Sequence, residues 1–441
     1  MKLSVYVLGR EVATLEPDGD FRSVLTYHPG VADDDLVSLT MGVRTESWVW
    51  NDEVHPFFQM NLPEGYLLEV LREQFAPHMP VRPVNLLAII GRNMVGRVQV
   101  AAPGADLHTA PKAIELADLL QGDNSEQAFA VLVREHATSG VSGVVPKFLD
   151  AQNETVLIGN HKKATLVTRR HIIKGSSDRL PYIALNEHLC MQVASKIMTT
   201  AKTEVSADGK ALVVHRFDVD ENGQPALAME DFCALLGLRP ANKYDTTWER
   251  IAKAVRDHIP GERRGETFHE LAKLLMLTYA LRNSDCHSKN LALIYTSATD
   301  ARLAPVYDML TTVVYPGYQH NPPGMSFMGK KTWKPGKSLQ NFIVGTFNVP
   351  IKQQAIILEQ ISNAVADTAP LLRQAMDEYP GFRETGKHML HAWHEGVAGL
   401  RDKRSYNIPD WQPGEACAGF SEPEKLDSGV KVIGRSELLG H

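Results

Sequence analysis

Four polar residues that could perform chemistry lie within six positions of one another in the segment LRNSDCHSKN, which begins at Leu281. These residues are Asp285, His287, Lys289 and Asn290. Such a cluster could be a loop that transfers phosphate, the site of a metal-dependent hydrolase, or a polar turn without chemistry. Residues elsewhere in the chain must decide among these three possibilities.

The spacing between Asp285 and Asn290 is that of the catalytic loop in protein kinases. In that loop the aspartate accepts the proton of the substrate hydroxyl, and the asparagine binds a metal ion. A second metal-binding carboxylate must follow a β-hairpin, and the segments LALIYT and RLAPVYDM predict two strands that lead to Asp308. In this interpretation Asp285 is catalytic, His287 supports the loop, and Lys289 neutralises charge on the transferred phosphate.

A metallohydrolase site and a polar turn both stay open on these residues alone. A metallohydrolase needs several histidine or carboxylate ligands, and His287 is the single histidine of the cluster. A polar turn after a buried helix needs no chemistry, and a lone D-x-x-x-x-N pattern often arises by chance. The kinase interpretation therefore depends on the residues upstream.

Two upstream features could hold the phosphates of a nucleotide. Lys174 ends the predicted strand RRHIIK, and Glu187 lies in the predicted helix ALNEHL, from which it could orient the lysine. The segment SGVSGVVPK, residues 139–147, contains glycines that let backbone amides approach a phosphate closely. A linker between two modules would have the same composition.

The segment VVHRFD, residues 213–218, predicts a strand that links two lobes. In the kinase interpretation, backbone groups of residues 215–217 bind the adenine, and Asp218 binds the ribose hydroxyls. An ordinary strand end would have the same sequence.

These residues need a scaffold of two lobes with a cleft between them. Strand-forming segments dominate before about residue 220, and helical segments dominate after it. We predict an α+β protein with a two-lobed protein-kinase-like fold. Its parts are an N-terminal α+β module at residues 1–105, an N-lobe at 106–225, a helical C-lobe at 226–405 and a polar tail at 406–441. Helices are expected in GYLLEVLREQF, in AMEDFCALLGL and in FHELAKLLMLTYALRN, the last of them buried.

The composition excludes several classes of protein. The chain has 441 residues and a formal net charge of -6, so no overall positive field draws it onto nucleic acid. Its four cysteines lie far apart and form no CxxC pair. This pattern indicates a reducing compartment and argues against a structural zinc site. The N-terminal residues alternate like a β-strand, and no stretch approaches the roughly 20 apolar residues of a membrane helix. A soluble, cytoplasmic protein is expected.

The order of the motifs resembles that of the HipA toxin kinases, which belong to bacterial HipBA toxin–antitoxin pairs. The resemblance rests on SGVSGVVPK, HIIKG, ALNEHL, RFD, NSDCHSKN and PVYDM, and on NLPEGYLLEVL and NLLAIIGRNMVGRVQV near the N-terminus. It extends up to about residue 400. The family is similar to eukaryotic protein kinases in its phosphotransfer core. The resemblance therefore implies a serine/threonine kinase toxin that depends on ATP and Mg²⁺.

The resemblance also implies roles for individual residues. Asp285 would be the catalytic base, and Asn290 and Asp308 would bind Mg²⁺. The residues expected to bind the nucleotide are Ser142, Gly143, Val144, Val145, Pro146, Lys147, Lys174, Glu187, His215, Arg216, Phe217, Asp218, His287, Asn290, Tyr307 and Asp308. Members of the family inactivate themselves by phosphorylating a serine in the loop before the Pro-Lys pair, for which Ser139 and Ser142 are the candidates here.

Three partners are implied by the resemblance, and no membrane. They are a HipB-like helix-turn-helix antitoxin, operator DNA reached through the antitoxin complex, and a protein substrate such as an aminoacyl-tRNA synthetase. The basic stretch GKKTWKPGKS suggests DNA contacts by Lys330, Lys331, Lys334 and Lys337. The same stretch supports a rival interpretation, in which the chain is a kinase-fold corepressor that acts mainly through antitoxin and DNA.

The chain departs from the family pattern at four positions. Gly140 stands where a serine is usual, Val145 where a glutamine is common and Cys286 where a glycine is expected. His215 is unusual in the segment that links the two lobes, residues 213–218, which is called the hinge. These differences bear on the autophosphorylation site and on the catalytic rate more than on the nucleotide site.

Overall fold

The computed structural model describes residues 2–19, 21–63, 68, 71, 82–107, 114–139, 165–401 and 406, and for residues 136–139 it describes the backbone alone. The predicted phosphate loop from residue 140 to residue 147, most of the predicted helix GYLLEVLREQF and the tail beyond residue 406 lie outside this description. None of the described helices combines the length and the apolar character that a membrane span requires.

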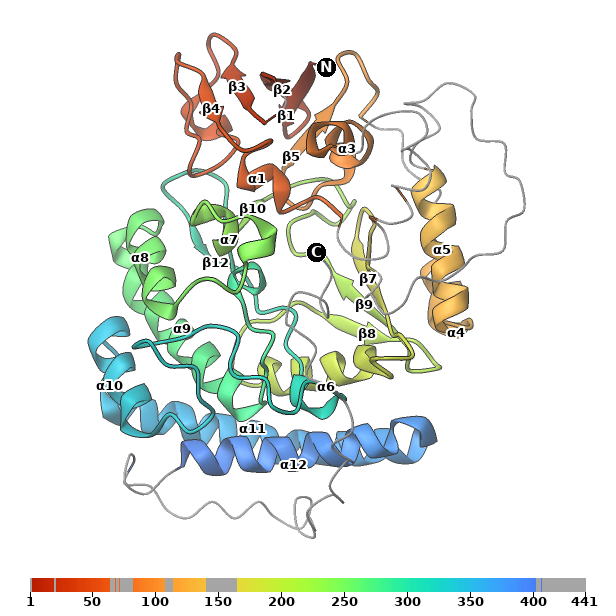
Figure 1. Ribbon diagram of the computed structural model, residues 1–441, viewed down its shortest axis with the longest axis vertical. Helices are drawn as coiled ribbons and strands as arrows, with labels where there is room; N and C mark the ends of the chain where they lie inside the picture. Colours follow the sequence, from red (N-terminus) through yellow and green to blue (C-terminus); the bar gives the residue numbers. More distant parts are fainter. Residues whose placement is uncertain are drawn as a thin grey trace.

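The N-terminal part forms a five-stranded antiparallel sheet in the order β4-β3-β2-β1-β5, which lies at the top of Figure 1. Its strands are β1 Leu3–Val7, β2 Arg10–Pro17, β3 Ser23–Tyr27, β4 Trp48–Trp50 and β5 Val98–Ala101. Two helices, α1 Pro56–Gln59 and α3 Pro83–Ile90, add side chains to the apolar cluster of this sheet. The cluster is separate from the main core, so this module has a core of its own.

A second, four-stranded antiparallel sheet has the order β6-β7-β9-β8. Its strands are β6 Thr165–Val167, β7 His171–Gly175, β8 Thr203–Val205 and β9 Ala211–His215, and its helices are α4 Leu116–Gln121, α5 Glu126–Ser139 and α6 Ile183–Ser195. Because side chains alternate along a strand, Ala211 and Val213 join the cluster of α4 and α5, whereas Leu212 and Val214 join that of α6. The strand predicted in RRHIIK is confirmed from His171 onward, and the strand predicted in VVHRFD is confirmed as far as His215. The helix predicted in ALNEHL is confirmed.

The C-terminal lobe is mainly helical, and its last two helices cross the bottom of Figure 1. Its helices are α7 Phe232–Leu235, α8 Trp248–His258, α9 Gly261–Ala280, α10 Gly336–Phe347, α11 Ile351–Glu378 and α12 Arg383–Leu400. A three-stranded antiparallel sheet, β10-β11-β12, lies beside the hinge and consists of β10 Ala228–Asp231, β11 Ala292–Tyr295 and β12 Arg302–Leu303.

The helix expected in AMEDFCALLGL is wrong for its first four residues. Residues 228–231 form β10, which pairs with β11 in a register that places Ala228 opposite Tyr295. This partner is far away in the sequence, so a local helical pattern could not reveal it. The helical part is the single short helix α7, whose first turn is capped by the Asp231 side chain through the amide of Ala234.

Helix α9 carries the chain into the loop that holds Asp285. Its residues from Thr267 onward are mostly buried and contribute to the main core, as the apolar sequence predicted, and the helix ends at Ala280. Helix α12 packs closely on this end, because a Cβ atom at Gly396 would lie 2.2 Å from the Ala280 carbonyl oxygen. Only a glycine allows this approach, so α12 fixes the last turn of α9 from which the loop departs.

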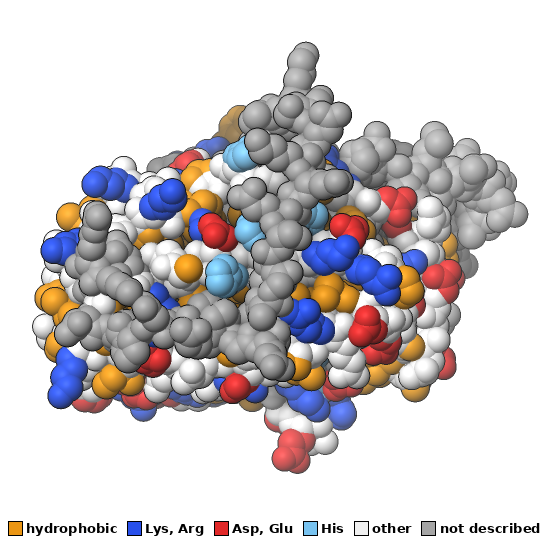
Figure 2. All heavy atoms as spheres, turned by 90° about the horizontal axis from the view of Figure 1, so that it is seen from below, with side chains coloured by type: hydrophobic (Ala, Val, Ile, Leu, Met, Phe, Trp, Pro, Cys, Tyr) orange, Lys and Arg blue, Asp and Glu red, His pale blue; other side chains and the backbone are white. Residues whose placement is uncertain are grey.

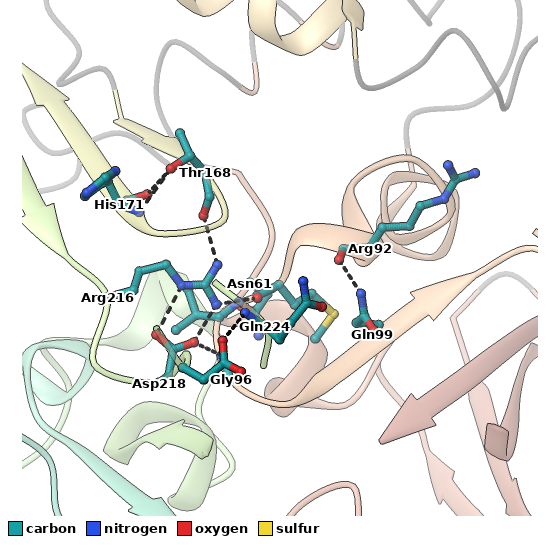
Figure 3. Close-up of polar contacts among 12 residues, drawn as sticks. Asn61, Arg92, Gly96, Gln99, Thr168, His171, Arg216, Asp218 and Gln224 are labelled. Atoms are coloured by element: carbon teal, nitrogen blue, oxygen red, sulfur yellow. Dashed lines mark hydrogen bonds and ion pairs between the residues drawn. The ribbon is translucent and has the colours of Figure 1, made fainter. Parts of the chain in front are cut away.

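An ion pair joins the N-terminal module to the strand that links the lobes. Arg216 binds Asp218 through two hydrogen bonds of 3.1 and 2.5 Å, and it also donates to the carbonyl oxygens of Thr168 and Met94. The Gly96 amide donates to the same carboxylate at 2.6 Å. Figure 3 shows Arg216 and Asp218 enclosed among these groups. The module and the hinge therefore share one buried polar network.

A buried carboxyl group forms a second joint. Glu230 on β10 accepts hydrogen bonds from the Ser38 hydroxyl at 2.6 Å, from the Leu39 amide at 3.0 Å and from the Tyr295 hydroxyl at 3.1 Å. It is fully buried, and burial raises the pKa of Glu230 to about 7. Hydrogen bonds, rather than a cation, hold this carboxyl group.

Candidate active site

The loop after α9 brings the predicted base and the predicted amide ligand together. Asn290 donates from Nδ2 to the backbone carbonyl of Asp285 at 2.9 Å, and the Asp285 amide donates to Asn283 Oδ1 at 2.9 Å. Within the described residues, Oδ2 of Asp285 and Oδ1 of Asn290 accept no hydrogen bond. Each residue is therefore fixed by its other groups and keeps one oxygen that can take a ligand.

Tyr244, which sequence reasoning did not identify, holds the other carboxylate oxygen of Asp285. Its hydroxyl donates to Asp285 Oδ1, and its ring meets His287 edge-on at 4.8 Å between centroids. The preceding carbonyl, of Lys243, accepts from both the amide and the hydroxyl of Ser288. Tyr244 comes from the segment before α8 and has no motif of its own, so no sequence signal could have found it.

His287 lies beside the base but is not suited to proton transfer at neutral pH. Its side chain is buried, and its Nε2 atom lies 3.8 Å from Asp285 Oδ1. Burial lowers the pKa of the His287 imidazole to about 4, so the ring is neutral at pH 7. The Nδ1 atom is buried without a hydrogen-bond partner among the described residues. This environment fits the supporting role predicted for His287.

A lysine and two acidic residues meet at the other side of the site. Lys174 on β7 donates from Nζ to Glu187 Oε1 on α6 and to Asp308 Oδ1, at 2.6 Å in both cases. The expected ion pair between Lys174 and Glu187 is therefore present. The Lys174 and Asp308 side chains are 12% and 19% exposed and that of Glu187 is 2% exposed, so solvent reaches the Lys174–Asp308 side of the cluster.

The hairpin expected before Asp308 is also present. Strand β11 pairs with β12 in an antiparallel register that sets Leu293 opposite Leu303. Asp308 follows with a φ of 59°, in the left-handed region that aspartate tolerates better than most residues. The chain thus turns sharply at Asp308, where its carboxylate meets Lys174.

The hinge offers fewer free backbone groups than the sequence suggested. The amide of His215 donates to the Lys202 carbonyl oxygen at 2.8 Å, and the amide of Arg216 donates to the Arg170 carbonyl oxygen at 2.9 Å. Phe217 instead presents its ring, which lies 6.2 Å from the ring of Tyr307. The Tyr307 hydroxyl in turn donates to the Lys289 carbonyl at 2.8 Å, so this aromatic pair is tied to the catalytic loop.

The ribose contact expected from Asp218 needs correction. Asp218 is 2% exposed, and its two oxygens are held by Arg216 and by the Gly96 amide (Figure 3). A carboxylate enclosed in this way cannot also bind a nucleotide. The strand predicted at residues 213–218 ends at His215, and the Arg and Asp that follow it bind each other and the N-terminal module.

One of the four lysines expected to contact DNA also needs correction. Lys331 is partly buried and donates from Nζ to the Gly324 carbonyl at 2.9 Å and to the Tyr244 carbonyl at 3.4 Å. It therefore braces the segment that carries Tyr244. The other three lysines, Lys330, Lys334 and Lys337, are exposed.

Cys286 is a core residue. Its side chain is 3% exposed within the main apolar cluster, and burial raises the pKa of the Cys286 thiol to about 12. The loop backbone at Cys286 is covered by Gly324, where a Cβ atom would lie 2.3 Å from the Cys286 carbonyl oxygen. The thiol beside the proposed base is thus a packing group and not a nucleophile.

The residues present fit magnesium bound to a nucleotide better than a metallohydrolase centre. Across the described residues, no three His, Cys, Asp or Glu side chains are placed to hold a metal ion by themselves. One carboxylate, from Asp308, and one amide oxygen, from Asn290, match the few protein ligands that Mg²⁺ uses when phosphates complete its coordination. The predicted loop residues Ser142, Gly143, Val144, Val145, Pro146 and Lys147 lie outside the described residues, as does the Ser139 side chain.

A strand lysine paired with a helical glutamate, a loop with Asp and Asn five positions apart and an Asp after a hairpin form the arrangement of a protein-kinase-like fold. A family model described as the HipA-like C-terminal domain matches residues 139–369, and one described as the HipA N-terminal domain matches residues 3–101. The chain belongs to the HipA family.

Relatives and a solved structure agree with this assignment. The protein Y4dM of Sinorhizobium fredii, named as a candidate kinase, is 27% identical over 336 residues, which cover 71% of this chain and 78% of the relative. Y4mE of the same organism, named likewise, is 26% identical over 333 residues with the same coverage.

The structural comparison concerns the fold. In the solved Shewanella oneidensis toxin–antitoxin complex of HipA, HipB and operator DNA, one chain matches with a TM-score of 0.61 and 15% identity. The match covers 92% of this chain and 97% of that chain. The predicted two-lobed, kinase-like fold is confirmed.

Proposed function

We propose that this chain is an ATP- and Mg²⁺-dependent serine/threonine protein kinase that acts as the toxin of a HipBA-type pair in the cytoplasm. The observation that carries the proposal is the Lys174, Glu187 and Asp308 cluster together with the Asp285–Asn290 loop. These two groups contain five polar residues from four separate segments, and each residue has the type that phosphoryl transfer requires.

Asp285 would accept the proton of the attacking hydroxyl. Its Oδ1 atom is held by Tyr244, and its backbone is held by Asn283 and Asn290, so the carboxylate is oriented before substrate arrives. The unpartnered Oδ2 atom is the one that can receive the substrate hydroxyl. General base catalysis of this kind contributes roughly 10²–10⁴-fold to a rate.

Lys174 would bind the phosphates, with Glu187 fixing its ammonium group. Asp308 lies on the exposed side of Lys174 and can exchange that contact for a metal ion. When bound, ATP supplies the phosphoryl group and Mg²⁺ neutralises its charge. Asp308 and Asn290 are the residues that would hold the metal. The ring of Phe217 beside Tyr307 offers an apolar surface for the adenine ring of ATP.

The partners follow from the family and from the Shewanella complex. A HipB-like antitoxin, operator DNA bound through it, and a translation-related protein substrate such as an aminoacyl-tRNA synthetase are the proposed partners. Autophosphorylation at Ser139 or Ser142 is part of the same proposal. The face that includes α11 and α12 carries charged groups of both signs (Figure 2), so DNA contact is expected through the exposed lysines near residue 330.

The test is phosphate transfer by the purified full chain. With radiolabelled ATP and Mg²⁺ we expect the chain to label itself and a protein from an extract. Asp285→Asn should reduce labelling at least 100-fold, because the general base is lost. Asp377→Asn, a surface change on α11, is the matched control and should label normally. Equal labelling by the wild type and Asp285→Asn, or none by the wild type, would contradict the proposal.

The corepressor interpretation is favoured by one observation, the exposure of Lys330, Lys334 and Lys337. It predicts that the chain strengthens an antitoxin–operator complex in a mobility-shift assay without any phosphate transfer. Replacing the three lysines with glutamine should remove that effect, whereas Asp285→Asn should leave it unchanged.

A further inference from the structure

A small pocket lies directly beside the proposed base. Its lining includes Asp285, Leu180 before α6 and Ile183 at the start of α6, together with Leu310, Tyr315 and Tyr318 from the segment after Asp308. It therefore borders the carboxylate that, in the proposed function, receives the acceptor hydroxyl. Because Asp285 Oδ2 faces no hydrogen-bond partner among the described residues, an acceptor hydroxyl on that atom would lie at the edge of this pocket.

Several polar groups of the pocket wall already bind protein partners, although Asn321 adds a carboxamide to the lining. The hydroxyls of Ser284 and Thr312 bind each other at 2.6 Å, and Thr312 also binds the Arg282 carbonyl. The Tyr315 hydroxyl accepts from Asn186 at 3.1 Å. Most of the remaining surface on the inside is carbon from leucine, isoleucine and tyrosine. An apolar group that enters gains from leaving water, whereas a polar group would lose its water without a replacement.

The pocket is also small. Its volume is about 30 Å³, which is room for roughly one to three methyl-sized groups. Leu180, Ile183 and Leu310 are each at most 5% exposed, so the walls cannot open without disturbing the main core. The space therefore suits a side chain of the size of alanine or valine.

We propose that this pocket is a specificity subsite that receives the side chain next to the acceptor serine or threonine of the protein substrate, and that it selects a small apolar residue. The inference rests on the proposed kinase function. An aspartate or glutamate at that position would be repelled by Asp285. A lysine would compete with the acceptor hydroxyl for Asp285 Oδ2.

The experiment measures phosphate transfer to peptides by the full chain with Mg²⁺ and radiolabelled ATP. The probe is a degenerate library of peptides with a central serine, in which one flanking position at a time is fixed. We expect alanine or valine at one position adjacent to serine to be favoured at least tenfold over aspartate and lysine. Each buried CH₂ group should add roughly fourfold until the pocket is full, and phenylalanine should be excluded.

Two variants give a readout that a structural defect would not produce. Ile183→Ala enlarges the pocket and should shift the preferred residue from valine to leucine or phenylalanine. Ile357→Ala is the matched control, because it removes the same atoms from the same core cluster in α11, away from the pocket. It should lower the rate at most, with the preference unchanged. Ile183→Val is the milder change and should shift the preference in the same direction.

The outcomes separate this proposal from the one on which it depends. Transfer to peptides without any preference beside serine, or an unchanged preference in both Ile183 variants, would overturn the subsite and leave the kinase function standing. If the wild type labels neither peptides nor itself, the kinase function fails and the subsite fails with it.

Discussion

Two ion pairs, one between Lys174 and Asp308 and one within the hinge between Arg216 and Asp218, both join a basic side chain to an aspartate but have different surroundings. Lys174 binds Asp308 at 2.6 Å with side chains 12% and 19% exposed, whereas Arg216 binds Asp218 with side chains 4% and 2% exposed. In the first pair the carboxylate borders solvent, and in the proposed function it exchanges its lysine for a metal ion. In the second, a backbone amide and two carbonyl groups complete the enclosure. Access to solvent therefore distinguishes a site for ligands from a joint between domains.

The largest effect should come from breaking the enclosed pair. Asp218→Ala leaves the Arg216 guanidinium buried without its carboxylate and the Gly96 amide without an acceptor. We expect the free energy of unfolding to fall by about 3–5 kcal/mol, measured by urea denaturation. Asp308→Ala, at the open pair, should lower the free energy of unfolding by less, because Lys174 keeps its ion pair with Glu187. Equal losses of stability in the two variants would show that both pairs are structural.

The next effect concerns Glu230, a buried carboxyl group that has hydrogen bonds in place of a cation. Its pKa is raised to about 7 in the folded protein from 4.5, so the folded state binds more protons than the unfolded state between these values. Stability from this group is therefore present at low pH and is lost as the pH rises through 7. The difference in unfolding free energy between Glu230→Gln and the wild type should move in favour of the variant by about 3 kcal/mol from pH 4.5 to pH 8.

Urea titrations at those two pH values check this prediction. Asp218→Asn is the comparison variant, because the Asp218 carboxylate of the wild type is held by the Arg216 cation. A Glu230→Gln difference that does not change with pH would mean that the carboxyl group is already ionised at pH 4.5.

A third prediction concerns the open pair. Asp308→Asn keeps the shape of the side chain but removes the charge that a metal ion needs, so phosphate transfer should fall at least 100-fold, about 2.7 kcal/mol. Calorimetry should show weaker binding of Mg²⁺ with ATP, and little change without Mg²⁺. Full binding and full activity in this variant would exclude Asp308 as a metal ligand.

The smallest effect should come from Tyr244→Phe, which keeps the ring beside His287 but removes the hydroxyl from Asp285. We expect kcat to fall about tenfold, or 1.4 kcal/mol, because the base is less well oriented. The KM for ATP should stay unchanged, since Tyr244 does not belong to the Lys174 cluster. Steady-state kinetics would distinguish this from a loss of folded protein, which lowers the apparent kcat together with the amount of native enzyme seen by circular dichroism.

Much of the fold and part of the site could be predicted from the sequence, because the signals were local. The strand with Lys174, the helix with Glu187 and the hairpin before Asp308 each have a period or a turn that the sequence displays. Their meeting in space followed from the order of the motifs. The predicted roles of these residues remain predictions until the variants above are measured.

The remaining features depended on contacts between distant segments. Asp218 and Asp308 both follow short strand segments, and only the position of Gly96 shows which of the two carboxylates is enclosed. Tyr244 reaches Asp285 from 41 residues away, and Lys331 braces Tyr244 from 87 residues away. The strand β10 exists because it pairs with β11. No local pattern contains such information.

The network around Arg216 has a mechanical consequence. One guanidinium group touches the turn at Thr168, the N-terminal module at Met94 and the hinge at Asp218. Because one side chain binds all three segments, a displacement of the N-terminal module is expected to carry the β6-β7-β9-β8 sheet with it. A partner that displaces the sheet of the module would thus also displace the hinge and change how far the two lobes close.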